Sequence, residues 1–285
     1  MDDLDAKSGL PVLDVLKSKH PEAVIPSPEV FEEYASVPSF VPLDITGCTV
    51  ESVARKMTGG AGPGGVDSIA LQSWLLRFGK ESAKLREALA SFTSWLANES
   101  PPWAAYRAFM ANRLIALDKC PGVRPVGVGE VWRRLFAKCV IKVAGGQAKD
   151  ACGTSQLCAG LEAGIEGAVH AVNALWDVHA SDDDWGFLLV DARNAFNEGN
   201  RLAFLWTVRH RWPAGARFVF NCYCHWGQLL VRSKDGDIAA IMHSKEGCTQ
   251  GDPLAMIVYG GGMLPLVELL EENIDDIVQP WYADD

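Results

Sequence analysis

The sequence predicts an α+β protein. Apolar residues recur at helical spacing in several separate segments of the chain. Other segments have the composition of strands, and some of these are joined by turn residues as in a β-hairpin. Helix-like and strand-like segments alternate without a regular repeat of about 20 to 50 residues, which argues against solenoid and propeller architectures. The 285 residues, 48% of them apolar, suffice for one large domain or two modest subdomains.

The chain is expected to begin with an irregular segment that is followed by helices. Residues 1–44 are rich in proline and acidic residues and show little periodicity, so we expect an extended or poorly ordered lead-in. From Ser82 onward, apolar residues at helical spacing predict a helix that stops before Pro101. A second short helix is expected over residues 103–110.

A hairpin and a basic helix are predicted next. Residues 114–117 and 123–128 have the composition of two strands around a turn. The following helix is expected to start near Val131 and to end at Gly145 and Gly146. The face opposite its apolar stripe carries four basic residues: Arg133, Arg134, Lys138 and Lys142.

The second half of the chain adds a helix over 161–175 and then a different kind of strand. Residues 187–190 are uniformly apolar, which is typical of a central strand buried on both faces, and Asp191 follows directly. Two strands within 228–242 are predicted to form a second hairpin. An apolar helix is expected to start at Pro253.

Cysteine usage and chain ends predict an intracellular protein with no membrane span. The acidic N-terminus does not resemble a signal peptide, and no run of about 20 apolar residues is present. The eight cysteines show no Cys-x-x-Cys spacing, so we expect reduced thiols. Cys222, Cys224 and His225 form one local cluster that could bind a metal. On a strand the adjacent Cys224 and His225 would face opposite sides, so we interpret these cysteines as buried thiols.

The charge is unevenly distributed. The net charge of −10, taken whole, argues against a nucleic-acid partner. However, residues 107–149 hold nine basic and two acidic residues, and residues 201–234 hold six basic and no acidic residues. Acidic segments separate these two basic blocks. Such blocks are often solvated helix faces, but the pattern also suits an enzyme that holds a polyanion and divalent cations.

Acidic residues follow two apolar segments that lie far apart in the chain. Asp191 follows the predicted strand at 187–190, and Asp284 and Asp285 follow the apolar and aromatic residues of 277–282. If the two segments were adjacent strands, carboxylates about 4 Å apart would repel by about 4 kcal/mol at an effective dielectric near 20, which calls for a divalent metal. On spacing alone, a turn or cap role for Asp191 and a surface role for the acidic pair are favoured.

Three motifs favour the metal site over these cap, turn and surface roles. Residues 188–197 contain Asp-x-x-Asn-Ala-Phe-Asn and resemble motif A of reverse transcriptases of the non-LTR retrotransposon type. Residues 244–254 resemble motif B of this family, and the Tyr-Ala-Asp-Asp at 282–285 resembles its motif C. Upstream, Lys119 and residues 122–126 resemble the family's fingers hairpin. The motifs occur in the family's order and at plausible spacing.

The resemblance extends from about residue 50 to 285 and implies a partial right-hand polymerase. Residues 45–180 would form a fingers-like region, and residues 181–285 would form the N-terminal part of the palm, an antiparallel sheet backed by helices. Residues 153–157 resemble the segment between fingers and palm. Family members continue after motif C with a return strand, a motif D and a helical thumb. None of these lies within the printed sequence, so we expect the isolated chain to be incomplete as an enzyme.

The resemblance also assigns roles to the acidic residues. Asp191, Asp284 and Asp285 would bind two Mg²⁺ ions, with Mn²⁺ as an alternative, through oxygen ligands. One ion would activate the primer 3′-hydroxyl, and the other would hold the triphosphate. The substrates implied are an RNA template, a DNA primer and deoxynucleoside triphosphates.

Substrate-binding roles are implied for five further residues. Lys119 and Arg124 would contact the incoming triphosphate, since the arginine fork suits phosphate oxygens. Phe196 would close the pocket against a 2′-hydroxyl. Gln250 and Gly251 would lie along the template and the nascent base pair, where glycine allows close backbone approach. The two basic blocks become candidate contacts to template and primer phosphates.

Two alternatives stay open. The chain could be an inactive retroelement relic, or a repurposed fragment, that only binds nucleic acid or protein. An RNA-dependent RNA polymerase is less favoured, because that class usually places an Asp where this chain has Phe196 and commonly carries Gly-Asp-Asp rather than residues 282–285.

Overall fold

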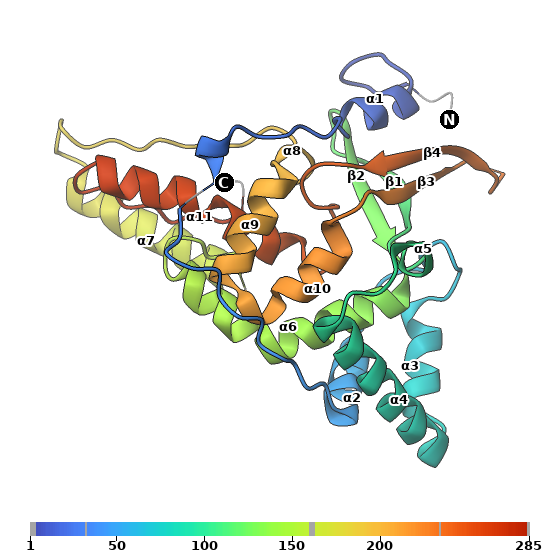
Figure 1. Ribbon diagram of the computed structural model, residues 1–285. Helices are drawn as coiled ribbons and strands as arrows, with labels where there is room; N and C mark the ends of the chain where they lie inside the picture. The colour runs from blue at the N-terminus through green and yellow to red at the C-terminus, as the bar shows by residue number, and fades with distance from the viewer. Residues whose placement is uncertain (1–3, 32, 160–162, 234, 284–285) are drawn as a thin grey trace.

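A four-stranded sheet and a layer of helices form the protein (Figure 1). The computed structural model describes residues 4–31, 33–159, 163–233 and 235–283. The α+β class is therefore confirmed. The strand order is β2-β1-β3-β4, and the strands are β1 (Asn112–Asp118), β2 (Val123–Gly129), β3 (Gly227–Arg232) and β4 (Ile238–Ser244).

Both predicted hairpins are confirmed, but the sheet they form is mixed. β1 pairs antiparallel with β2, and β3 pairs antiparallel with β4. The two hairpins join through β1 and β3, which run parallel, with Asn112 opposite Leu229 and Leu114 opposite Val231. The expectation of an antiparallel sheet is therefore wrong for the described strands. Long-range pairing between two hairpins leaves no local signal in the sequence.

The first two helices after the lead-in have side-chain caps at their N-termini. The side chain of Thr46 accepts a hydrogen bond from the backbone N–H of Thr49, and Asp67 accepts one from that of Ala70. The predicted helix from Ser82 is confirmed as α4, while the helix expected over 103–110 is reduced to a single turn. The bounds are α2 (Gly47–Arg55), α3 (Ser68–Leu76), α4 (Gly79–Asn98) and α5 (Trp103–Tyr106).

The helix α6 (Val131–Cys152) is longer than predicted. Gly145 and Gly146 do not end it, because its apolar face continues beyond them through buried Ala148 and Cys152. Packing of that face outweighs the cost of about 1 kcal/mol for each interior glycine. The helix ends at Gly153, whose φ of 55° lies in the left-handed region.

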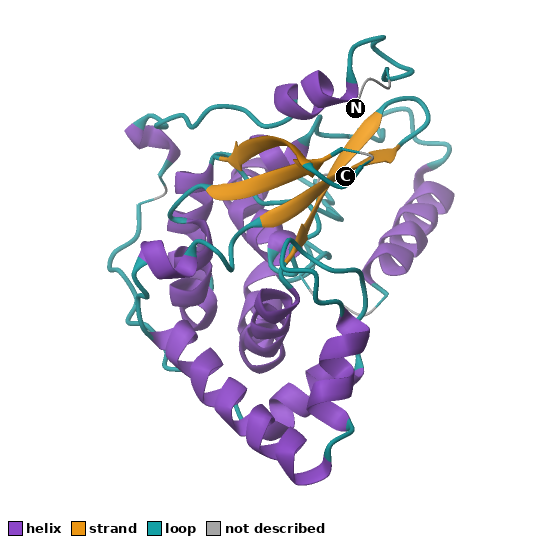
Figure 2. Cartoon of the chain, turned by 90° about the vertical axis from the view of Figure 1, so that its right-hand side faces the viewer, coloured by secondary structure: helices purple, strands orange, loops and turns teal. Residues whose placement is uncertain are grey.

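Most of the remaining helices contribute residues to the main apolar core, whereas the helix over residues 164–179 contributes none, and Figure 2 shows helices packed beneath the sheet. The helix predicted to begin at Pro253 starts two residues later and contains Pro265. No helix among the described residues is long and apolar enough to cross a membrane. The bounds are α7 (Gly164–His179), α8 (Ala195–Glu198), α9 (Arg201–Arg211), α10 (Pro213–Tyr223) and α11 (Ala255–Asn273).

The lead-in is part of the fold rather than a poorly ordered tail. Its helix α1 (Val12–Ser18) places Val15 and Leu16 against the sheet, where they form a second apolar core with residues of all four strands. A short 3₁₀ turn, η1 (Pro28–Val30), follows. The rest crosses α9 as an extended strap, with the ring of Tyr34 stacked on that of His210 at 3.9 Å (Figure 1).

We predict that truncating the side chain under α1 destabilises the whole protein. Leu16 is fully buried, so Leu16→Ala is expected to lower the free energy of unfolding by about 2 to 5 kcal/mol. Lys17→Ala, at an exposed position of the same helix, is the control and is expected to change it by about 0.5 kcal/mol or less. Urea unfolding measures both. Equal stabilities of the two variants would contradict the packing of α1 on the sheet.

Candidate active site

The loop over residues 244–252, which resembles motif B, joins β4 to α11 and binds the segment that resembles motif A. The backbone N–H of Cys248 donates to the carbonyl of Phe196 at 2.5 Å. The backbone N–H of Gly247 donates to the carbonyl of Gly199 at 2.7 Å. These two hydrogen bonds connect segments about fifty residues apart in the chain, so the two motifs are neighbours in the fold.

Glycine is required at two positions of this loop. At Gly247, with φ of 53°, a Cβ atom would lie 2.0 Å from the carbonyl oxygen of Phe196. At Gly251, with φ of 101°, it would lie 2.7 Å from that of Gly127 in β2. The backbone N–H of Gly127 also donates to the carbonyl of Gln250 at 2.8 Å. Glycine at 251 therefore allows the loop backbone to approach the first hairpin closely, while the predicted contact of Gln250 and Gly251 with a template stays a prediction.

A buried arginine fixes the loop from within. The guanidinium of Arg201, at the start of α9, donates to the carbonyls of Ser244, Glu246 and Gly247 and to the Ser244 hydroxyl, at 2.6 to 2.9 Å. The Glu246 carboxylate accepts the backbone N–H of Arg201 at 2.7 Å. Burial lowers the pKa of Arg201, but an arginine stays charged well above neutral pH. Its donors therefore hold the loop in one conformation.

A second buried arginine holds the other end of the loop. Arg133 of α6 forms an ion pair with Asp252, and both side chains are almost fully buried. The hydroxyl of Tyr223 donates to the same carboxylate at 2.8 Å. Burial, together with that carboxylate, raises the pKa of Tyr223, so the hydroxyl keeps its proton. Arg134 is buried as well and donates to the carbonyls of Thr58 and Gly60.

These contacts correct part of the charge interpretation. Arg133 and Arg134 were expected on the outer face of their helix, and Arg201 belongs to the second basic block. All three are buried and bind protein groups, so none of them can contact template or primer phosphates. Lys119 and Arg124 differ, because both are exposed on the β1–β2 hairpin as predicted.

The segment before Asp191 does not form the predicted strand. Residues 186–193 have no helix or strand, and the side chains of Leu188 and Leu189 are 87% and 90% exposed. The uniformly apolar run was expected to be buried on both faces, but no described strand pairs with it. Asp191 is exposed, and its carboxylate has no hydrogen-bond or ion-pair partner among the described residues.

The segment that resembles motif C is attached to residues 155–157. The Gln156 side chain is buried and receives the backbone N–H of Ala283 at 2.8 Å, while its amide donates to the Ala283 carbonyl at 3.2 Å. Trp281 forms an isolated parallel bridge with Gln156. Apart from this bridge, residues 277–283 form no strand. Asp284 and Asp285 lie outside the described residues.

The helix α11 connects the ends of the first and third motifs. The ring of Tyr259 packs on Phe196 with centroids 4.9 Å apart. At the next residue, Gly260, a Cβ atom would lie 2.8 Å from Cγ of Gln156, the residue that holds Ala283. Consecutive residues of one buried helix therefore contact the motif A segment and the support of the motif C segment.

The described residues do not by themselves form a metal site. No group of three His, Cys, Asp or Glu side chains that could hold a metal lies among residues 4–31, 33–159, 163–233 and 235–283. Cys222 is a buried thiol, as interpreted, although it lies on α10 rather than on a strand. Cys224 is half-buried. Of the three predicted magnesium ligands, the described chain contains only Asp191, whose free carboxylate suits a hydrated cation.

Comparisons with known proteins add no assignment. No protein-family model matches the sequence, and a search of curated proteins gives no match.

Three residues that organise the site were not predicted to hold it together. Gln156 lies in a segment that was recognised only as a whole, and its hold on Ala283 depends on the tertiary fold. Arg133 has the clearest signal, because buried Phe136, Ala137 and Val140 follow it at helical spacing. A charged residue on an apolar stripe predicts a buried partner. Arg201 has no comparable local signal.

We predict that a methyl group at Gly247 disrupts the contact between the two motifs. Gly247→Ala combines a positive φ with a backbone clash, so we expect it to lower the free energy of unfolding by more than about 2 kcal/mol. Gly146→Ala is the matched control, because it lies within α6 with no atom in the way and is expected to be neutral or stabilising by up to about 1 kcal/mol. Chemical denaturation measures both, and a neutral Gly247→Ala would contradict the described loop.

Proposed function

We propose that this chain is the fingers and the N-terminal palm of an RNA-directed DNA polymerase. Convergence of the three motifs on one support carries the proposal. The motif A and motif B segments share backbone hydrogen bonds, and both contact α11 or the β1–β2 hairpin. Gln156 holds the residue that precedes the acidic pair against the same helix. If the three motifs matched the family only by chance, they would not be expected to lie next to one another in the fold.

In this proposal, Asp191 acts with Asp284 and Asp285 to bind Mg²⁺. The bound ions supply the charge that activates the primer hydroxyl and stabilises the leaving pyrophosphate. The chain's own residues position the substrates. Lys119 and Arg124 are exposed on the hairpin and are available to triphosphate oxygens. β2, which carries Arg124, is hydrogen-bonded to the motif B loop. The distance between this loop and the residues that would contact the triphosphate is therefore fixed.

Phe196 would set the preference for deoxynucleotides. Its ring is held by Tyr259, and its carbonyl is held by the N–H of Cys248. A ring that packs on Tyr259, on a residue whose backbone is also hydrogen-bonded, leaves little room to move away from a 2′-hydroxyl. The same position explains why we favour DNA synthesis over RNA synthesis.

One observation favours the alternative of a fragment that only binds nucleic acid or protein. The strand expected before Asp191 is absent, and its apolar side chains are exposed. A catalytic aspartate on an unpaired segment is poorly positioned, because metal-assisted transfer needs its ligands held within a fraction of an ångström. Metal binding and primer extension separate the two functions.

We predict that the Asp191 carboxylate contributes to metal binding. Mn²⁺ titrations followed by electron paramagnetic resonance are expected to show weaker binding in Asp191→Asn than in the parent chain, because one anionic ligand is lost. In a protein that also carries the family's motif D and thumb after residue 285, primer extension on an RNA template with deoxynucleotides is expected to fall by about 10²-fold or more. Asp183→Asn, in the exposed acidic turn before the motif, is the control. Equal Mn²⁺ affinity in all three proteins would refute the role of Asp191.

We predict that the Phe196 side chain excludes the 2′-hydroxyl of ribonucleotides. Phe196→Val is expected to reduce the preference for deoxynucleotides over ribonucleotides by about tenfold or more, since a smaller side chain admits the 2′-hydroxyl. The measured quantity is the ratio of kcat/KM values for the two nucleotides. A loss of folded protein lowers both values equally and leaves their ratio unchanged. An unaltered ratio would exclude Phe196 as the residue that contacts the sugar.

A further inference from the structure

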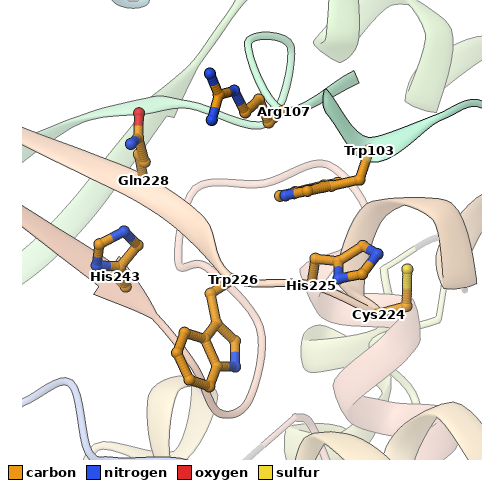
Figure 3. A pocket seen from close by; sticks show the side chains of 7 residues that line it. All are labelled: Trp103, Arg107, Cys224, His225, Trp226, Gln228 and His243. Carbon is orange, nitrogen blue, oxygen red and sulfur yellow. The ribbon is translucent and has the colours of Figure 1, made fainter. Parts of the chain in front are cut away.

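An open pocket of about 540 Å³ lies outside the candidate active site (Figure 3). Its lining comes from three parts of the chain that the mixed sheet brings together: α5 and the residue after it, the segment that leads into β3, and the end of β4. None of these residues belongs to the proposed catalytic set. The side chains used below are those of Trp103, Arg107, His225, Trp226, Gln228 and His243.

The pocket presents aromatic ring faces to solvent. The rings of Trp103 and His225 lie 4.7 Å apart at an angle of 37°. Trp226 is 52% exposed, although a tryptophan that serves only the core would be buried. Figure 3 shows the Trp103 ring between Arg107 and Trp226. The pocket therefore has room for a planar group beside more than one ring.

The polar groups around the rings favour an anionic ligand. No carboxylate lines the pocket, whereas Arg107 is exposed and has no acidic partner among the described residues. The ammonium of Lys245 lies 4.8 Å from the ring centre of Trp226 and also pairs with Glu22. Gln228 and His243 provide donors and acceptors that suit the edge of a heterocyclic base.

We infer that this pocket binds an unpaired base of single-stranded nucleic acid. Trp226 and Trp103 offer faces for stacking, which is tolerant of base identity because every base has a π-face. Arg107 binds the neighbouring phosphate, and Gln228 contacts the edge of the base. A strand suits the pocket better than a free nucleotide, because the site is open and small-molecule sites bury most of their ligand.

This binding goes beyond the proposed polymerisation, since it needs neither a metal nor the carboxylates. The pocket would hold a strand where the segment before β3 meets the end of β4. Arg107, which precedes β1, is an exposed member of the first basic block, and it lines the pocket. Arg133 and Arg134 of the same block are not.

The test is fluorescence anisotropy of the full chain with labelled oligouridylate of about 12 nucleotides, in the presence of a chelator. Trp226→Ala is expected to raise the Kd by about 5-fold to 100-fold, and Trp226→Phe is expected to restore most of the affinity. Trp176→Ala removes a tryptophan of similar exposure on α7 and is expected to leave the Kd unchanged. Arg107→Ala is expected to reduce the slope of log affinity against log salt by about 0.7.

Each further outcome decides between two interpretations. Equal affinities of the parent chain and Trp226→Ala, with both proteins folded by circular dichroism, would overturn the inference. If uridine monophosphate competes as strongly as the unlabelled strand, the pocket binds a free nucleotide, and the inference that it binds a strand is wrong. Asp191→Asn is expected to bind the strand normally, so failure of the polymerase proposal would leave this result unaffected.

Discussion

The buried guanidinium of Arg201 fixes the loop between β4 and α11, and the candidate site depends on that loop. A charge removed from water is costly unless its donors are satisfied, and here three carbonyls and a hydroxyl accept from it. The ion pair of Arg133 with Asp252 holds the far end of the same loop. Because both ends are fixed from inside, the loop can offer its backbone to the motif A segment on one side and to β2 on the other.

α11 provides the common support beneath these contacts. A helix that is apolar on most of its surface must be covered on several sides, and its neighbours are therefore placed close to one another. Tyr259 contacts Phe196, and Gly260 gives room to Gln156. Phe196, which follows Asp191, and Gln156, which holds Ala283 before the acidic pair, therefore contact the same turn of α11. The apolar segment at 187–190 lies outside this arrangement.

The charge pattern of the sequence has two different physical meanings in the fold. Some basic residues bind groups inside the protein: Arg201 donates hydrogen bonds to backbone carbonyls, and Arg133 pairs with a buried carboxylate. Others, such as Arg107 and Arg124, remain at the surface, where a phosphate can reach them. A count of charges along the chain cannot separate these groups, because the direction of each side chain depends on what packs against its helix or strand.

The sequence by itself determined the elements whose signals are local. Turn residues between apolar segments predicted both hairpins, and helical spacing predicted α4 and the start of α6. Tertiary structure alone decided the parallel pairing of β1 with β3, the packing of α1 on the sheet and the continuation of α6 through Gly145 and Gly146. It also left residues 187–190 exposed, although their composition is that of a buried strand. The physical reason is that burial and strand pairing are settled between segments distant in the chain, where their free energies outweigh local preferences that differ by about 1 kcal/mol or less for each residue.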